Sequence, residues 1–579
     1  MHDVMSDTWV ASDALGRALP GHDECGDPRT GRFVGIFYFL WLGQHTQEGP
    51  FDNTRLIAEN PEAPAWEAGR TYHWGEPEVG YYLSTDRWVI RRHAHLLADA
   101  GVDTLIFDAT NDRIYPEALA AVCETLRQVR SEGERTPDIC FLASRESIRK
   151  LWEQVYLPGL YEDLWLRWKG RPLLLFGQHI GMPREEDLPQ DVRSFFTLRA
   201  SWAWDSLPWY GDGGYHRWPW VAHHPQPVGW DTPGTPEQVP VAIGQHPLSN
   251  RGRSYHNGRQ PETDRYYLTP HTGEGLCFQE QWDRALSVDP EFVFVTGWNE
   301  WIAGSVRRGV EETDEDLHRR WCFYPGAPMT RGGRVIGPGD IYFIDQFNQE
   351  FSRDAEPMRG GHTDNYYYQL VANVRRYKGV RRPPIAGLAR TIDTSGPFAQ
   401  WDGVGAVYRD HLGETQHRDE KGWGSVGRLT NRTGRNEFVE LRATHDDTSI
   451  HFLATCAADV TPWTDPHWMM LFLNLDRRPD TGWHGFDAVV NLPPLGPDRT
   501  SVRRNAGGWR WEPSGEARYR VEGKRLMVSV PREALGLPRG PVAFDFHWHD
   551  NLQAPGDRAD WFLSGDSAPN RRFDYRYEG

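Results

Sequence analysis

The sequence predicts an α/β protein, a (β/α)₈ TIM barrel followed by an antiparallel β-sandwich. Eight short apolar runs precede residue 350, and several of them are separated by helical patterns. Beyond about residue 390 the pattern changes to short stretches in which apolar and polar residues alternate, separated by turn residues. Continuous apolar runs are typical of parallel strands covered on both faces, whereas alternation is typical of antiparallel strands. A chain of 579 residues also exceeds what one hydrophobic core usually serves.

The apolar runs are expected to be the barrel strands, and the periodic segments between them the helices. The predicted strands are 34–40, 103–108, 138–143, 172–176, 195–200, 239–244, 292–297 and 341–345. The predicted helices are 85–101, with Thr85 as N-cap and Gly101 as terminator, 115–130, 145–156, 275–288 and 366–378. A doubly wound sheet is the alternative, but no G-x-G-x-x-G follows any of these strands.

Three segments are expected along the chain. Residues 1–380 form the catalytic barrel, and 381–396 form a linker in which Pro383 and Pro384 stop the preceding helix. Residues 397–579 form the β-sandwich. Its expected strands are 438–444, 449–456, 468–476, 486–492, 525–531 and 542–550.

Charge and composition exclude several classes of partner. The 64 Lys and Arg against 81 Asp and Glu give a net charge of −17, which argues against nucleic acid and anionic membranes. No apolar run approaches the ~20 residues of a membrane span. The N-terminal residues lack the features of a signal peptide, so we expect a cytoplasmic protein or a processed secreted form, with the oligomeric state left open. The six dispersed cysteines are expected to be buried free thiols.

An excess of aromatic residues points to carbohydrate. The chain has 27 Trp, 22 Tyr and 25 Phe, and many lie in polar, Gly- and Pro-rich stretches such as 202–230. Loops of that composition cannot bury every ring. Aromatic faces that stack on sugars would explain the excess better than a core does.

Acidic residues follow several of the predicted strands, where TIM barrels carry their catalytic groups. Glycoside hydrolysis needs one carboxylic acid and one carboxylate. Glu300 is the first candidate, because Trp298 and Trp301 on either side would raise its pKa toward that of a general acid. The alternative is a helix cap, or an ion pair with a structural arginine such as Arg307.

Three further acids are candidates for the partner carboxylate: Asp108, Glu76 and Asp345, in that order. Asp108 and Asp345 end predicted strands and are equally compatible with strand caps or buried ion pairs. Glu76 lies in an aromatic loop and is also compatible with a hydrogen bond to a sugar hydroxyl.

Polar and aromatic residues near the same strand ends are expected to contact the substrate. They are Trp41, His45, Trp74, Asn111, Trp204, His246, Trp298, Asn299 and Trp301. His223 and His224 are more typical of substrate or packing contacts than of metal ligands, and no metal or cofactor is expected for catalysis.

Short motifs in residues 30–380 resemble two families of glycoside hydrolases. GWNEWIAG (297–304) resembles the N-E-W-x-E-G signature of family 99 endo-α-mannosidases and their family 71 relatives. The opening FYFLWLG and the segment 364–377 are similar to other parts of that group. The resemblance implies retaining chemistry at α-linkages by two glutamates three residues apart. Glu300 matches the first, but Ala303 occupies the position of the second, so a partner acid must come from another strand.

The C-terminal region resembles the family 9 carbohydrate-binding modules, on residues 401–410, 474–491 and 544–551. That resemblance implies a sugar platform of paired Trp rings and, in some members, a structural calcium. Asp476, Asp480 and Asp487 would supply its oxygen ligands, and turn caps are the alternative.

These observations together predict a glycoside hydrolase that cleaves α-linkages in a polysaccharide or oligosaccharide. The alternative is a non-catalytic glycan-binding protein on a hydrolase-like barrel, because the second glutamate is missing. A metal-dependent esterase is a weaker third possibility, since no G-x-S-x-G, H-E-x-x-H or phosphate loop is present.

Overall fold

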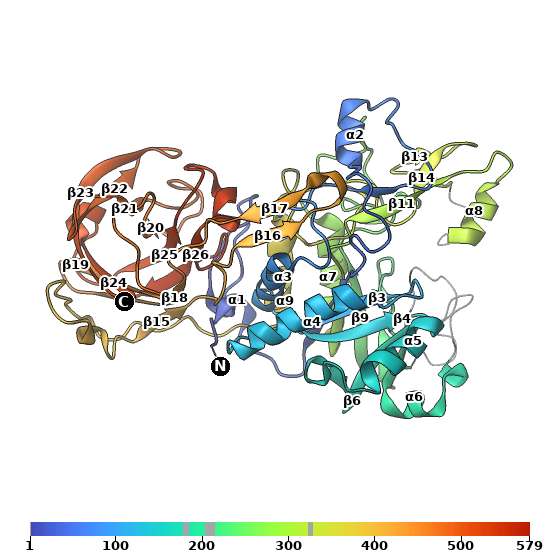
Figure 1. The fold of residues 1–579 in the computed structure, drawn as a ribbon, viewed down its shortest axis with the longest axis horizontal. Helices are drawn as coiled ribbons and strands as arrows, with labels where there is room; N and C mark the ends of the chain where they lie inside the picture. The colour runs from blue at the N-terminus through green and yellow to red at the C-terminus, as the bar shows by residue number, and fades with distance from the viewer. Residues whose placement is uncertain (1, 178–184, 202, 204–214, 322–327) are drawn as a thin grey trace.

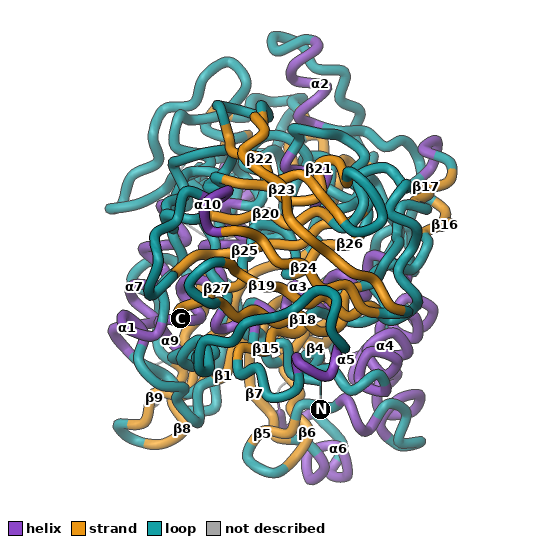
Figure 2. The backbone as a smooth tube through the Cα atoms, turned by 90° about the vertical axis from the view of Figure 1, so that its left-hand side faces the viewer, coloured by secondary structure: helices purple, strands orange, loops and turns teal. Residues whose placement is uncertain are grey.

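The computed structural model describes residues 2–177, 185–201, 203, 215–321 and 328–579. Its N-terminal part is built on a curled, mostly parallel sheet covered by helices, and its C-terminal part on a separate antiparallel sheet (Figure 1). Figure 2 shows the C-terminal sheet in front of the N-terminal part. Within the described residues, no helix is long and apolar enough to span a membrane.

Seven parallel strands form the curled sheet. Their order is β7-β6-β4-β3-β1-β10-β9, and short β5 (Arg167–Trp168) and β8 (Gly229–Thr232) add antiparallel pairs to β6 and β9. The parallel strands are β1 (Phe33–Tyr38), β3 (Thr104–Ala109), β4 (Asp138–Ala143), β6 (Arg171–Gly177), β7 (Thr197–Ser201), β9 (Thr235–Ala242) and β10 (Phe292–Trp298). Each of the first seven predicted runs contributes one of them. The described strands make an open, half-barrel sheet and not the closed eight-stranded barrel that was expected.

The eighth predicted run lies elsewhere. Residues Ile341–Phe343 form β14, which pairs antiparallel with β11 (Ile302–Arg307), and β11 pairs antiparallel with β2 (Thr71–His73). The prediction of a barrel strand at 341–345 was therefore wrong. A short apolar run does not reveal which neighbour its backbone will pair with, because strands of both kinds can be apolar on both faces.

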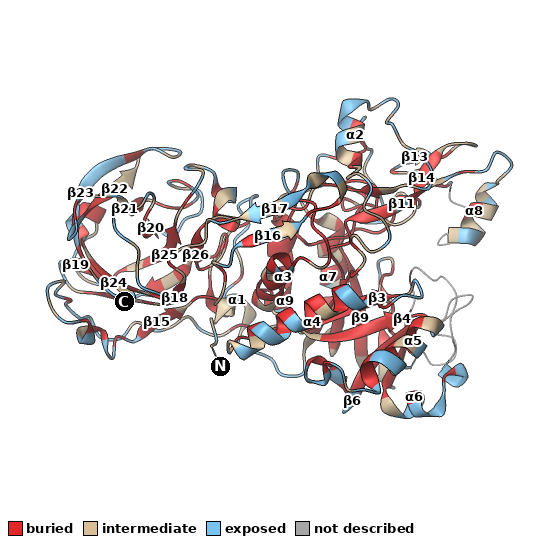
Figure 3. Cartoon of the chain, in the orientation of Figure 1, coloured by how far each residue is buried: buried red, intermediate tan, exposed pale blue. Residues whose placement is uncertain are grey.

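Helices cover the outer face of the curled sheet, and their exposed faces point to solvent (Figure 3). They include α3 (Arg87–Asp99), α4 (Pro116–Ser131), α5 (Arg145–Leu151), α7 (Leu276–Val288) and α9 (Asn365–Lys378), close to the predicted segments. The N-cap of α3 is Asp86 instead of Thr85, because the Asp86 carboxylate accepts the backbone N–H of Val89 at 3.1 Å.

Alternation along the strands separates two cores. On β1, Val34 and Ile36 belong to the core beneath the helices, whereas Phe37 belongs to a second core inside the curl. On β3, Ile106 lies in the inner core and Phe107 in the outer one. Because side chains alternate, Asp108 at the end of β3 faces the inside of the curl, as Ile106 does.

The C-terminal part contains one continuous antiparallel sheet of eleven strands. Its order is β15-β18-β19-β24-β23-β22-β21-β20-β25-β26, with β27 (Tyr575–Glu578) also on β25. The strands are β15 (Ala406–Arg409), β18 (Phe438–His445), β19 (Ser449–Cys456), β20 (Met470–Asn474), β21 (Ala488–Pro494), β22 (Arg499–Asn505), β23 (Trp511–Glu522), β24 (Arg525–Pro531), β25 (Ala543–Asp550) and β26 (Asp566–Ala568). All six predicted strands are present. The sheet curls into a nearly closed barrel (Figure 1), so the expected two-sheet sandwich is not what forms.

Buried ion pairs join the two parts. Arg571, which follows β26, makes a bidentate pair with Glu78 at 2.5 and 3.0 Å, and Arg418 binds Asp86 at 2.6 and 3.0 Å. Residues 380–396 between the parts contain neither helix nor strand. Polar pairs of this kind fix orientation, because each charge is costly to leave buried alone.

Candidate functional site

Glu300 lies in the turn that leads from β10 into β11, at the carboxyl end of the parallel sheet. Its side chain is buried, and the Arg353 guanidinium grips it with Nη2 at 2.7 Å from Oε1 and Nε at 3.2 Å from Oε2. The Gln346 amide also donates to Oε2, and the Glu300 backbone N–H donates to Asp354 at 2.9 Å. The structural-arginine alternative is thus realised, with Arg353 in the place that Arg307 was expected to take.

Burial and the arginine act on Glu300 in opposite directions. Removal of water raises the pKa of the Glu300 carboxyl, and the Arg353 guanidinium opposes that rise. Because both side chains are almost fully enclosed, neither the Glu300 oxygens nor the Arg353 nitrogens that bind them are accessible to a substrate in this conformation. Glu300 is therefore better placed to hold Arg353 than to transfer a proton.

Asp345 follows β14 and lies at the open end of the same group. One carboxylate oxygen is 3.4 Å from Nη2 of Arg353, the atom that also binds Glu300, and 39% of its side chain is exposed. Arg353 thus bridges a buried and an accessible carboxylate. The accessible one is Asp345.

Asp108 shares this electrostatic environment from the other side. Burial raises the pKa of Asp108 to about 6, the negative charge of Asp345 adds to that rise, and hydrogen bonds from Thr110 oppose it. The Thr110 hydroxyl donates to Asp108 at 2.7 Å and its backbone N–H at 3.0 Å. The structure thus brings together three of the four predicted acids, Glu300, Asp345 and Asp108.

Polar and aromatic groups surround these acids. His45 is hydrogen-bonded to the Tyr115 hydroxyl at 2.8 Å, and the Asp108 charge helps to raise the pKa of Tyr115 to about 12, although burial is the larger cause. Asn111 is exposed and approaches Asp108, with its amide 3.5 Å from Oδ2. Trp41, half-buried, stacks on Phe39 with 4.8 Å between ring centroids. Contact of His45, Asn111 and Trp41 with a substrate stays a prediction.

Four predicted substrate contacts are instead fully buried. Trp74 and Trp301 stack on each other at 4.4 Å, and Trp298 packs edge-on against His93. Asn299 uses its amide on the backbone of Phe39, accepting its N–H at 2.7 Å and donating to its carbonyl at 2.8 Å. These side chains organise the site from below and present no face to a ligand in this conformation. A Trp beside a catalytic motif carries no sequence signal of which way its ring points.

Of the three remaining predicted residues, Glu76 lies apart from the acids, His246 is buried near Arg353, and Trp204 is not described. Glu76 pairs with Arg55 and, at 3.0 Å, with Arg359, two exposed arginines, so its carboxylate serves a surface ion-pair network. His246 is buried, and burial, together with the Arg353 charge, lowers its pKa well below the ordinary range. Trp204 lies outside the described residues.

The sequence interpretation missed Arg353 and Trp220. Trp220 is half-buried, and the Arg353 guanidinium lies 5.6 Å from its ring centroid. Neither residue lies in a predicted strand, although Trp220 falls within the aromatic stretch 202–230. The one sequence signal for Arg353 is its position three residues after the segment IDQFNQE (344–350), which contains two acidic residues.

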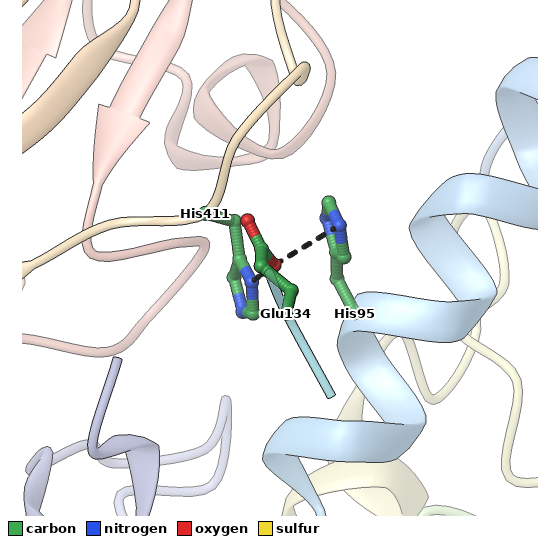
Figure 4. Close-up of side chains that lie close together, drawn as sticks. All are labelled: His95, Glu134 and His411. Carbon is green, nitrogen blue, oxygen red and sulfur yellow. Dashed lines mark hydrogen bonds and ion pairs between the residues drawn. The ribbon is translucent and has the colours of Figure 1, made fainter. Parts of the chain in front are cut away.

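His95, Glu134 and His411, outside these acids, form a candidate metal centre. Figure 4 shows His95, Glu134 and His411, whose nitrogen and oxygen atoms lie close enough for one ion. However, the two imidazoles stack at 4.2 Å with 7° between their planes. A metal bonded to an imidazole nitrogen lies in the plane of that ring, and no point lies in both stacked planes. His411 instead bridges Glu134 at 2.6 Å and Asp99 at 3.0 Å.

The aspartates expected to bind calcium serve as turn caps. Asp487 accepts the backbone N–H of Leu475 at 2.7 Å, and Asp476 accepts that of Arg478 at 3.0 Å. Asp480 is exposed and pairs with the Arg478 side chain at 2.9 Å. A carboxylate already paired with an arginine is a poor calcium ligand, so this turn does not fit the ion.

Comparisons with known proteins add little to this geometry. No protein-family model and no curated protein matches the sequence. Two solved structures of the GH99 endo-α-mannosidase from Bacteroides thetaiotaomicron, one of them in complex with BIS-TRIS-propane, are similar to this chain at 14% and 15% identity. Each covers 60% of this chain, and the matches span 97% and 98% of those chains, with a TM-score of 0.33 for both. That score does not establish a common fold.

Proposed function

We propose that this protein is a glycoside hydrolase in which Asp108 is the general acid and Asp345 is the nucleophile or base. The observation that carries the proposal is the contrast between two neighbouring carboxyls. Burial gives Asp108 a pKa of about 6, so it holds a proton in mildly acidic solution where an ordinary aspartate has lost it, whereas Asp345 is accessible beside a guanidinium. Pairs of acids whose surroundings differ in this way divide the acid and base roles of glycosidases.

Glu300 acts in this scheme as a positioning residue. Its carboxylate fixes Arg353, and the same guanidinium nitrogen reaches Asp345. In many catalytic sites, a reacting carboxylate is held in place by a charged side chain that is itself fixed by another residue. The general-acid role therefore passes from Glu300, where the sequence put it, to Asp108.

Accessible aromatic side chains near the acids support a carbohydrate substrate. Trp41 and Trp220 are each half-buried beside the acids, as expected for rings that stack on sugar faces. The resemblance of residues 297–304 to family 99 and 71 hydrolases favours α-linked glycans. Because Ala303 lacks the carboxylate of that signature, we do not assign the mannose specificity of the family.

Asp108→Asn and Asp345→Asn test the proposal, with Asp112→Asn from the same loop as an exposed control. The substrates are a panel of α- and β-linked polysaccharides and of 2,4-dinitrophenyl glycosides. On a polysaccharide, both variants should lose about 10²–10⁴-fold in kcat/KM, the usual contribution of an acid or base. Asp108→Asn should lose far less on the dinitrophenyl glycoside, because that leaving group needs no proton.

The pH profile gives an independent readout. Since the protonated form of Asp108 is the active one, kcat/KM on polysaccharide should fall as pH rises through about 6, and Asp108→Asn should lack this limb. If Asp108→Asn retains wild-type turnover on polysaccharide, the assignment of the acid is wrong. If Glu300→Gln alone removes the acid limb, Glu300 has the role that the sequence suggested.

A non-catalytic glycan-binding protein is the second candidate, favoured by Ala303 and by the engagement of Glu300 with Arg353. Calorimetric titration with the same polysaccharides, followed by product analysis after long incubation, separates the two. Binding without any hydrolysis would support this second function and contradict the first.

A further inference from the structure

Three buried acids meet where the two ends of the C-terminal sheet approach each other. Asp410 directly follows β15, Glu414 lies four residues further on, and Asp566 opens β26. The backbone N–H of Phe438 on β18 donates to Asp566 at 2.6 Å, which joins the two ends across this seam. One carboxylate oxygen from each acid lies within 4.8 Å of the others.

The oxygens of this cluster lack the hydrogen bonds that burial normally demands. Both carboxylate oxygens of Asp410, which is 0% exposed, and Oε2 of Glu414 have no hydrogen-bond partner among the described residues. The other Glu414 oxygen accepts the Asn570 amide at 2.7 Å and faces Nδ1 of His95 at 3.3 Å. Buried carboxylates without partners are costly, so unpartnered oxygens that converge on one point indicate a missing positive group.

Arg92 is a buried cation whose charge acts on Glu414 and Asp566, but it does not fill that point. Arg92 lines the same cavity as Glu414 and Asp566, but its guanidinium lies over the Trp88 ring, 3.5 Å from the centroid. Across the described part of the chain, no hydrogen bond or ion pair joins Arg92 to any of the three acids. The cluster therefore keeps an excess of negative charge in a water-poor place.

We propose that Asp410, Glu414 and Asp566 bind a calcium ion. All the donors are carboxylate oxygens, which Ca²⁺ prefers, and a Ca–O bond of about 2.4 Å lets one ion contact atoms up to about 4.8 Å apart. The cavity beside Glu414 and Asp566 gives room for the water ligands that complete a coordination shell of six to eight. Zinc would favour nitrogen or sulfur donors and shorter bonds.

The position of the ion gives it a structural role. It joins the segment after β15 to β26, on opposite ends of the curled sheet. The ion would thus reinforce a seam that is already crossed by hydrogen bonds such as Phe438–Asp566 and Tyr575–Arg409. Glu414 also faces His95 on α3, which ties the closed seam to the N-terminal part. Loss of the ion should therefore loosen the C-terminal sheet and its attachment.

Calorimetric titration with CaCl₂ and thermal melts of the whole chain test the proposal. The protein is first treated with EGTA and then freed of the chelator. We expect one Ca²⁺ per chain and a Tm that rises with Ca²⁺ concentration, because the ion binds only the folded state. MgCl₂ should raise Tm less, since Mg²⁺ demands a tighter octahedral shell. Metal analysis of the untreated protein gives a readout that needs no variant.

Asp410→Asn and Asp566→Asn should weaken Ca²⁺ binding about 10–100-fold or more and flatten the Tm response, whereas Asp480→Asn, in the exposed turn, should match the wild type. The proposal is overturned if the wild type shows no heat of Ca²⁺ binding, no bound metal and no Ca²⁺-dependent Tm. That result would indicate that the three carboxyls share protons instead. An unchanged Ca²⁺ response in both cluster variants would place the ion elsewhere. Neither outcome depends on glycosidase activity.

Discussion

Arg353→Met separates the two possible states of Glu300. Arg353 binds both Glu300 oxygens, and its Nη1 donates to the carbonyls of Gln245 at 3.0 Å and Asp345 at 3.3 Å. Methionine keeps much of the volume but removes every one of these donors. If Glu300 is an ionised partner, the variant leaves a buried charge uncompensated, which costs about 3–5 kcal/mol of unfolding free energy.

The loss should depend on pH in a fixed direction. Without Arg353, burial and the charges of Asp345 and Asp354 act on Glu300 unopposed and raise its folded-state pKa above the unfolded value of about 4.3. A carboxyl whose pKa is raised by folding makes the folded state bind more protons, so stability falls as pH rises above about 4.3, by up to ~1.4 kcal/mol per unit. The deficit of Arg353→Met should therefore be small near pH 5 and larger near pH 8.

Urea unfolding of four proteins at both pH values measures this: wild type, Arg353→Met, Glu300→Gln and the double variant. Neutralising Glu300 in the Arg353→Met background should restore stability at pH 8, with a coupling free energy of about 2–3 kcal/mol. Equal deficits at the two pH values, together with additive single losses, would refute the ion pair and return Glu300 to the list of candidate proton donors.

Two further predictions concern residues that hold the site and the two parts in place. Asn299→Ala removes both hydrogen bonds to Phe39 and leaves a non-glycine residue at a φ of 61°, so the urea midpoint should fall by an amount equivalent to about 2–4 kcal/mol; an unchanged midpoint would contradict this. Glu78→Gln removes the bidentate partner of the buried Arg571 and leaves it with Asp364 at 3.5 Å, so it should cost up to about 3–5 kcal/mol. Glu146→Gln, which breaks an exposed pair with Arg149, is its control and should leave the midpoint unchanged; equal effects would refute the role of burial.

The parts of the fold that local sequence determines were predicted well. Seven of the eight apolar runs became parallel strands, because residues such as Val34 and Phe37 must be buried on opposite faces, and such runs can hardly be solvent-exposed. The failures concern pairing and closure. Contacts between distant segments decide whether residues 341–343 join the parallel sheet or pair with β11. They also decide whether the C-terminal strands form two sheets or one curled sheet. Alternation constrains each strand, and it does not specify the partner.

The candidate site shows the same limit at the level of chemistry. The strand ends singled out Asp108 and Glu300, which lie together because parallel strands bring their carboxyl ends to one edge, whereas Asp345 reaches them from the antiparallel β14 through Arg353. Their roles depended on Arg353, which comes from a segment without regular structure and has no positional signal. A carboxylate between two tryptophans is expected to be a desolvated acid. The Arg353 guanidinium opposes the rise in the pKa of Glu300 without cancelling it, and it encloses both carboxylate oxygens. The acid role therefore falls to the carboxyl that burial isolates and no arginine reaches, and among the three that is Asp108, held only by Thr110 and Asn111.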